Sequence, residues 1–177
     1  KRIVDRIRSD PDPDARNIAI DGEWDGTYPT EPGAYLRTVQ FSNKHGEAYC
    51  VVLRHQGGEP AFMPSIQHGL DELKRLFQYD VEAGWLPQIG GHFLRADLPW
   101  LIYNGIDLRP EYCAALRPED MRTSGGWDTS LAYHAVNETA SYDLADMTVR
   151  LTTAPRYDIP LARWKTAYCA ARKIKAK

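Results

Sequence analysis

The stretch Asn17-Ile-Ala-Ile-Asp-Gly-Glu-Trp24 decides the fold of this chain. Its β-branched and aromatic residues predict a strand, and side chains alternate between the two faces of a strand. The acids Asp21 and Glu23 then share one face, and the other face carries the apolar residues Ile18, Ile20 and Trp24. Two carboxylates on one strand face repel each other, and burying them unpaired would cost several kcal/mol. The pattern leaves two interpretations: an exposed edge with two ordinary acids, or a site for Mg²⁺ or Mn²⁺.

A hairpin and a helix are predicted after this strand. Residues 35–42 and 47–53 are rich in β-branched and aromatic residues and are joined by Asn43-Lys-His-Gly46, which favours an antiparallel hairpin. Ser65 is a helix-capping residue type, and apolar residues follow it at helical spacing. They are Ile66, Leu70, Leu73 and Phe77.

The second half of the chain adds a strand and several helices. The short apolar run 86–93 fits a buried strand, and a helix begins at Asp97, because Pro99 is tolerated only in a first turn. Residues 143–151 and 161–174 predict two further helices. Three strands, a helix, a strand and then mostly helices indicate an α/β fold with a mixed sheet flanked by helices.

Length and composition predict one domain. A chain of 177 residues with 43% hydrophobic residues and a net charge of −2 fits a globular domain with a single core. We expect residues 1–16 to be a polar lead-in, because Pro11 and Pro13 disfavour regular structure, and residues 17–177 to form the domain. No stretch resembles a signal peptide or a membrane span. These features predict a cytoplasmic protein without a membrane partner.

The cysteines indicate neither disulfides nor a zinc site. Cys50, Cys113 and Cys169 are odd in number, lie far apart and form no C-x-x-C pair. We expect three buried, reduced thiols.

Charge is unevenly distributed along the chain. Residues 161–177 carry six basic side chains and no acidic ones, which leaves 16 of the 22 basic residues against all 24 acidic ones in the rest. Two interpretations of this basic tail are open. It is either the solvated face of a helix or a surface that contacts phosphate groups.

A third carboxylate belongs to the segment Ile89-Gly-Gly-His-Phe-Leu-Arg-Ala-Asp97. Here Asp97 follows a glycine-rich strand exit and opens a helix. A simple N-cap explains an aspartate at this position. The same position also lets a carboxylate reach back over the end of a sheet, toward Asp21 and Glu23.

The two segments together resemble the DEDD superfamily of 3′-5′ exonucleases, specifically the proofreading exonuclease domain of family A DNA polymerases, with ribonuclease D as a related family. Asp21 and Glu23 match the Asp-x-Glu of the first family motif. The second motif is matched by Gly91, His92 and Asp97.

The likeness continues beyond these motifs. Residues 127–133, Trp-Asp-Thr-Ser-Leu-Ala-Tyr, resemble an Asp-Thr-x-x-Ala segment of the family, and residues 142–147 resemble the Leu-x-x-Leu-Ala helix after it. The resemblance covers roughly residues 17–151 and implies a ribonuclease H-like fold, with a three-stranded antiparallel start followed by parallel strands.

The resemblance also implies a function. In the complete site, Asp21, Glu23 and Asp97 would be catalytic carboxylates that bind two Mg²⁺ or Mn²⁺ ions. The reaction would remove nucleotides from a single-stranded or frayed DNA 3′ end, and a polymerase domain would follow in the same chain. The expected substrate-binding residues are Trp24, His92 and Phe93, although packing in the core or in a loop also explains the two aromatic ones.

The sequence departs from the family pattern at several positions. Phe93 replaces an Asn of the second motif, and Ala96 replaces a Phe or Tyr. The third motif, Tyr-x-x-x-Asp, is matched literally by Tyr142 and Asp146, but their neighbours fit the preceding helix better. We therefore expect the fourth carboxylate beyond Lys177. Two alternatives stay open: a catalytically impaired domain that positions nucleic acid, and an RNA-trimming enzyme like ribonuclease D.

Overall fold

The computed structural model describes residues 2–61, 65–108, 126–141, 143–154 and 158–172. The chain forms two compact units, Lys1–Thr129 and Ser130–Lys177. The first unit contains the sheet and the three acids singled out above, and the second contains helices.

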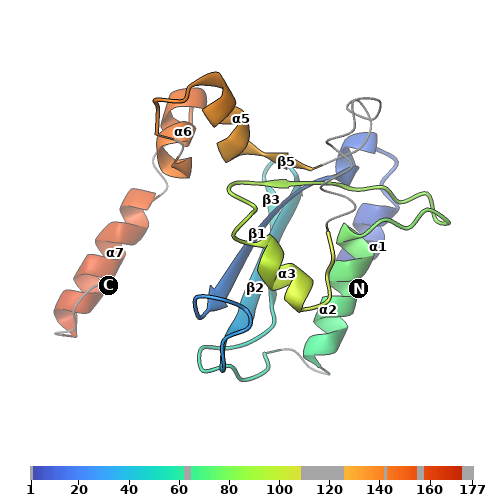
Figure 1. Ribbon diagram of the computed structural model, residues 1–177, viewed down its shortest axis with the longest axis horizontal. Coiled ribbons are helices and arrows are strands. Elements are labelled where there is room, and N and C mark those ends of the chain that lie inside the picture. The colour runs from blue at the N-terminus through green and yellow to red at the C-terminus, as the bar shows by residue number, and fades with distance from the viewer. Residues whose placement is uncertain (1, 62–64, 109–125, 142, 155–157, 173–177) are drawn as a thin grey trace. The chain divides into compact units, whose positions relative to one another are not determined.

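A five-stranded mixed sheet forms the first unit, with strand order β3-β2-β1-β4-β5 (Figure 1). The antiparallel part consists of β1 (Asn17–Asp25), β2 (Tyr35–Lys44) and β3 (Glu47–Val52). The parallel part adds β4 (Gln88–Gly91) beside β1 and β5 (Trp127–Asp128) beside β4. The predicted mixed α/β sheet, antiparallel at its start and parallel beyond, is therefore confirmed.

Strand β1 is central and two-faced, as its sequence predicts. Ile18 and Ile20 are buried, whereas Asp21 and Glu23 are exposed on the opposite face. The pairing with β2 shifts register between Glu23 and Trp24, an irregularity that falls directly after the second acid.

In the described part of the first unit, the sheet is accompanied by α1 (Arg2–Arg8), the short 3₁₀ turn η1 (Pro13–Arg16), α2 (Ile66–Phe77) and α3 (Leu98–Tyr103). Ser65 caps α2 as predicted, because its side chain accepts a hydrogen bond from the His68 amide. At the opposite end of α2, the ring of Phe77 packs edge to face on Phe41 of β2, with 5.8 Å between ring centroids. This contact joins α2 to the sheet.

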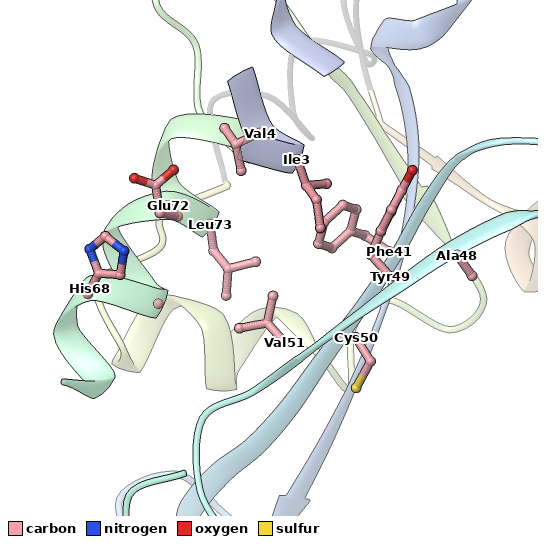
Figure 2. Close-up of a pocket in the computed structure, with 11 residues that line it drawn as sticks. Ile3, Val4, Phe41, Ala48, Tyr49, Cys50, Val51, His68, Glu72 and Leu73 are labelled. Atoms are coloured by element: carbon pink, nitrogen blue, oxygen red, sulfur yellow. The ribbon is translucent and has the colours of Figure 1, made fainter. Parts of the chain in front are cut away.

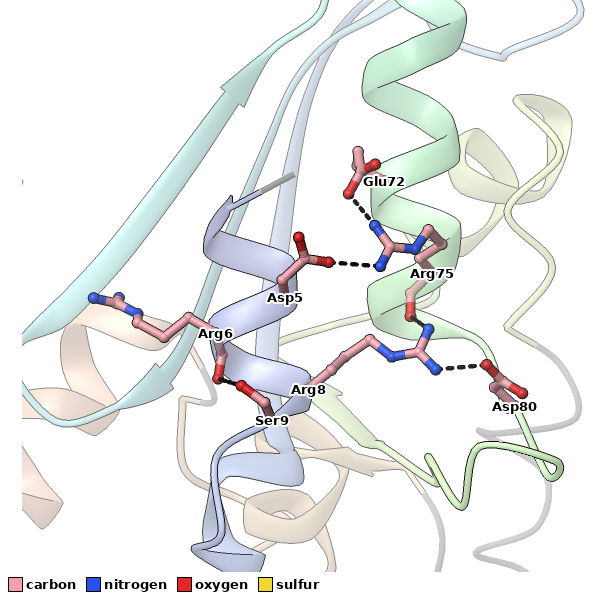
Figure 3. A network of polar contacts seen from close by, with 7 residues as sticks. All are labelled: Asp5, Arg6, Arg8, Ser9, Glu72, Arg75 and Asp80. Carbon is pink, nitrogen blue, oxygen red and sulfur yellow. Dashed lines mark hydrogen bonds and ion pairs between the residues drawn. The ribbon is translucent and has the colours of Figure 1, made fainter.

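Regular structure begins earlier than expected. Pro11 and Pro13 do follow the first helix, but the residues before them form α1, whose Val4 and Ile7 are buried. Ion pairs join this helix to distant parts of the chain: Arg75 with Asp5 at 2.7 Å, Arg8 with Asp80 at 2.5 Å and Arg6 with Glu47 at 3.1 Å. Figure 3 shows the first two. The apolar i, i+3 pair of α1 outweighs the polar composition of residues 1–16.

The second unit contains α5 (Thr129–Val136, which starts at the boundary), α6 (Leu144–Leu151) and α7 (Asp158–Ala171). Asp143 caps α6 by accepting hydrogen bonds from the amides of Ala145 and Asp146. No helix in the described part of the chain is long and apolar enough to cross a membrane.

One expectation about the cysteines is wrong. Cys169 is buried, but Cys50 is exposed on β3, because alternation along this strand turns its side chain away from the core. Cys113 lies outside the described residues.

Glycine is required at the end of β4. A Cβ atom at Gly91 would lie 2.8 Å from the Ile20 carbonyl oxygen and 2.6 Å from the Leu94 side chain. We expect Gly91→Ala to lower the free energy of unfolding by about 1–3 kcal/mol in urea melts. The control Val136→Ala, at an exposed helix position, should change it by less than about 0.5 kcal/mol. Equal midpoints for Gly91→Ala and wild type would contradict this packing.

Candidate active site

The site lies where β4 ends and β1 continues. The last paired residues of these two strands are Ala19 and Gly90. Three residues further along β1, the Gly22 amide donates a hydrogen bond to Oδ1 of Asp97, at 2.8 Å. A side chain therefore binds the backbone of β1 at a point beyond the end of the neighbouring strand.

The turn between β4 and α3 brings Asp97 to this position. The amides of Ala96 and Asp97 donate to the carbonyls of Phe93 and Leu94, which folds the connection tightly. Asp97 stands at the N-terminal edge of α3, but its side chain makes no capping hydrogen bond. Asp97 is therefore the N-cap residue by position, as predicted, but its carboxylate binds β1 instead of capping the helix.

All three predicted acids lie near Gly22. Asp21 and Glu23 flank this glycine in the chain, and Asp97 is hydrogen-bonded to its amide. Asp97 is only 5% exposed, and the charges of both other acids act on it. The structure thus brings together residues that are 75 positions apart in the sequence.

Burial dominates the electrostatics of Asp97. Loss of hydration raises the pKa of this carboxyl to about 7, with smaller contributions from the negative charges of Asp21 and Glu23. The Gly22 amide opposes the shift in pKa, but does not cancel it. Partial loss of hydration also raises the pKa of Asp21, although its side chain stays open to solvent. The N-terminus of α3 does not keep Asp97 ionised in the metal-free protein, because this helix has only six residues and burial outweighs its dipole.

The donor set suits a hard cation. Among the described residues, no lysine or arginine forms an ion pair with Asp21, Glu23 or Asp97. Three mutually repelling carboxylates without such a partner have the ligand chemistry that Mg²⁺ and Mn²⁺ prefer. Within the same described ranges, however, no group of three His, Cys, Asp or Glu side chains is arranged to hold a metal ion.

Asp128, which is not among the predicted site residues, holds the turn that carries Asp97. It is 7% exposed, and its two oxygens accept hydrogen bonds from the amides of Phe93 and Leu94, at 3.0 and 2.9 Å. Phe93 has a φ of 58°, an unfavourable left-handed conformation for a bulky residue. Residues 127–133 stand out in the sequence, but nothing in their pattern shows that this aspartate binds the β4–α3 turn.

The predicted substrate-binding residues occupy different surroundings. The Trp24 ring stacks on buried Trp100 at 5.3 Å and packs against the core. His92 contacts Thr129, the residue after Asp128, with 3.0 Å between Nδ1 of His92 and Oγ1 of Thr129. The Phe93 ring lies under the Arg95 guanidinium, at 4.3 Å from the ring centroid.

The described residues do not identify a fourth carboxylate. Tyr142, which begins the literal third motif, lies outside the described residues, and Asp146 belongs to α6 in the second unit. Its assignment to a position beyond Lys177 stays a prediction.

A separate cavity of about 330 Å³ lies between α1, α2 and the β2–β3 hairpin (Figure 2). Its lining is mostly apolar, with His68 and Glu72 of α2 at one side. None of the three site acids lines it. The cavity is therefore distinct from the carboxylate site.

Comparison with known proteins identifies the fold. No protein-family model and no curated protein matches the sequence. The Nibbler EXO domain of Aedes aegypti matches with a TM-score of 0.52 and 14% identity, over 88% of this chain and 64% of that chain. NrnC of Brucella melitensis matches with a TM-score of 0.50 and 18% identity, over 78% of this chain and 53% of that chain.

A second Brucella melitensis NrnC structure, with bound Mg²⁺, has a TM-score of 0.48 at 18% identity, over 79% of this chain and 57% of that chain. This chain thus spans between about half and two-thirds of the length of these proteins. The likeness confirms the ribonuclease H-like fold.

The pKa of Asp97 predicts how stability depends on pH without metal. Its pKa of about 7 exceeds the ordinary value of 3.8, so the folded protein binds more protons than the unfolded chain between these values. The stabilisation of the folded state by the protonated Asp97 carboxyl is complete at low pH and is lost as pH rises through about 7. Relative to Asp97→Asn, we expect the free energy of unfolding in EDTA to fall by at most about 1.4 kcal/mol per pH unit from pH 4 to 7. Parallel pH profiles for the two proteins would contradict the raised pKa.

The role of Asp128 predicts a graded loss of stability. Asp128→Ala leaves the Phe93 and Leu94 amides without their acceptor, which costs about 1–3 kcal/mol for each buried group. Asp128→Asn keeps one acceptor oxygen and should lose less. Urea melts of both variants test this order, and an Asp128→Ala protein as stable as wild type would exclude the role.

Proposed function

We propose that this chain is a 3′-5′ exonuclease domain that hydrolyses nucleic acid with divalent cations held by Asp21, Glu23 and Asp97. The observation that carries the proposal is the hydrogen bond from the Gly22 amide to Asp97. It joins a carboxylate of the β4–α3 turn to the residue that stands between the two acids of the central strand, at the end of a ribonuclease H-like sheet. A match of the same fold is itself an EXO domain, which agrees with this proposal.

Each of the three acids has a distinct place in the proposed site. Asp21 and Glu23 share one face of β1 and offer two carboxylates side by side. Asp97 uses Oδ1 to accept from Gly22 and retains its second oxygen as a cation ligand. Bound cations would supply an activated water and stabilise the charge that develops on the leaving 3′ oxygen. The acids themselves hold and orient the cations and do not attack the substrate.

Asp128 stabilises the turn that carries Asp97. By accepting from two consecutive amides it fixes the turn that leads to Asp97. His92 begins the same turn and contacts Thr129, so it is placed to approach a phosphate group bound near the acids. Trp24 packs on Trp100, and its role is to support β1 next to Glu23 rather than to stack on a base.

The substrate proposed for this site is a single-stranded or frayed DNA 3′ end, with a polymerase domain following in the same chain. This finer assignment follows from the resemblance of the two carboxylate motifs to proofreading exonucleases. RNA trimming is the alternative, because selection of the 2′-OH depends on contacts that the acids do not determine.

A second candidate function is a catalytically impaired domain that positions nucleic acid. Two observations favour it. Among the described residues, no three Asp, Glu, His or Cys side chains are arranged to hold a metal ion. Phe93 also stands where the related exonucleases have Asn, and it occupies a left-handed conformation.

An end-labelling assay tests the proposed activity. The full-length protein, with its complete set of acids, is incubated with Mn²⁺ and a 5′-labelled single strand of DNA or RNA, and the products are resolved by length. We expect stepwise shortening from the 3′ end. Asp21→Asn and Asp97→Asn should each lower the rate by roughly 100-fold or more, because each removes a charged cation ligand.

The control variant is Asp71→Asn, which removes an exposed acid of α2 that lies near Lys74 and should leave the rate unchanged. Shortening of RNA but not DNA would favour the trimming alternative. Binding of Mn²⁺ in calorimetry without shortening would favour the impaired domain. Absence of both binding and shortening would exclude a cation site at these acids.

A further inference from the structure

One face of α7 carries a row of large side chains. Leu161, Trp164 and Tyr168 of α7 and Arg172, directly after its last residue, recur at intervals of three or four residues, and we call these four the aromatic row. The Trp164 and Tyr168 rings are stacked with 5.1 Å between centroids and 29° between planes. The Arg172 guanidinium lies 4.2 Å from the centre of the Tyr168 ring. The row is thus a continuous stack of two rings and one planar cation.

Within its own unit, the described residues leave the aromatic row exposed. Trp164 is 60% exposed and Tyr168 is 37% exposed, and Leu161 beside them is also exposed. Single exposed apolar residues are ordinary, but several adjoining ones on one helix face indicate a surface that binds something. Aromatic side chains with a polar edge are typical of such surfaces.

Charge limits what the partner can be. The sequence 161–177 contains six basic residues and no acidic one, whereas the rest of the chain has an excess of acidic residues. A polyanion is therefore repelled by most of the protein and attracted by this end. The charge complementarity favours a polyanion over an apolar or acidic surface of another protein.

Ring stacking narrows the class of polyanion. Bases of a single strand expose their faces and stack on aromatic side chains, whereas bases in a duplex already stack on each other. A guanidinium that lies flat on a ring keeps its N–H groups at its edge, where they can donate to phosphate oxygens. The outer face of Trp164 can accept a base, and Arg172 at the other end of the stack can donate to a backbone phosphate.

We propose that the aromatic row of α7 binds single-stranded nucleic acid. A base stacks on the face of the Trp164 ring that is turned away from Tyr168, Tyr168 supports that ring, and Arg172 donates to a phosphate. This surface goes beyond the proposed hydrolysis, because it requires neither cations nor the acids Asp21 and Asp97. Binding measured in EDTA therefore tests the surface independently of any exonuclease activity.

The experiment measures the fluorescence anisotropy of labelled oligo-dT and oligo-U, titrated with the whole chain in EDTA. We expect Trp164→Ala and Tyr168→Ala each to weaken binding by about 5- to 100-fold, the range found when a stacking residue is removed. Trp164→Phe, which keeps an aromatic face, should restore most of the affinity. Arg172→Gln should reduce the slope of log affinity against log salt by about 0.7, because one phosphate contact is lost.

Val136→Ala is the matched control, since it shortens an exposed apolar side chain of α5 in the same unit. Circular dichroism spectra establish that each variant is folded. Wild-type protein that does not bind either oligonucleotide would overturn the proposal. The same holds if Trp164→Ala and Tyr168→Ala bind as tightly as wild type. A change of oligomeric state in Trp164→Ala, with unchanged affinity for both strands, would instead assign the row to contact between copies of the chain.

Discussion

The hydrogen bond between the Gly22 amide and the Asp97 carboxylate is the contact on which the proposed site depends. Strand β1 runs past the end of β4, so its backbone needs another partner there. Asp97 supplies that partner, and in doing so its charge is placed beside Asp21 and Glu23. The same contact that completes the sheet therefore also gathers the three acids.

Gathering these acids has an electrostatic cost that the described part of the chain does not offset with a lysine or arginine. Burial raises the pKa of Asp97 to about 7, and the nearby acids add to the shift in pKa. Asp128 is buried too, but it is satisfied by two backbone amides. The contrast between the two aspartates is informative: one stabilises a turn, and the other stays poorly solvated among like charges. A residue in the second condition is a candidate for function.

Much of this arrangement could be predicted from local sequence patterns. Alternation in residues 17–24 predicts the central strand and the face shared by Asp21 and Glu23, and the spacing after Ser65 predicts α2. Local patterns fail where long-range contacts decide. The burial of Val4 and Ile7 makes a helix of a segment expected to be irregular, and the bonds made by Asp97 and Asp128 join residues far apart in the chain. Composition and periodicity carry no information about such contacts.

The most direct test of the central claim is a crystal of the whole chain soaked in Mn²⁺ and measured at a wavelength where manganese scatters anomalously. The account predicts an anomalous peak within coordination distance, about 2.0–2.6 Å, of carboxylate oxygens from Asp97 and at least one of Asp21 and Glu23. A map with no peak there, while Asp97 stays bonded to Gly22, would contradict a cation site built on these acids.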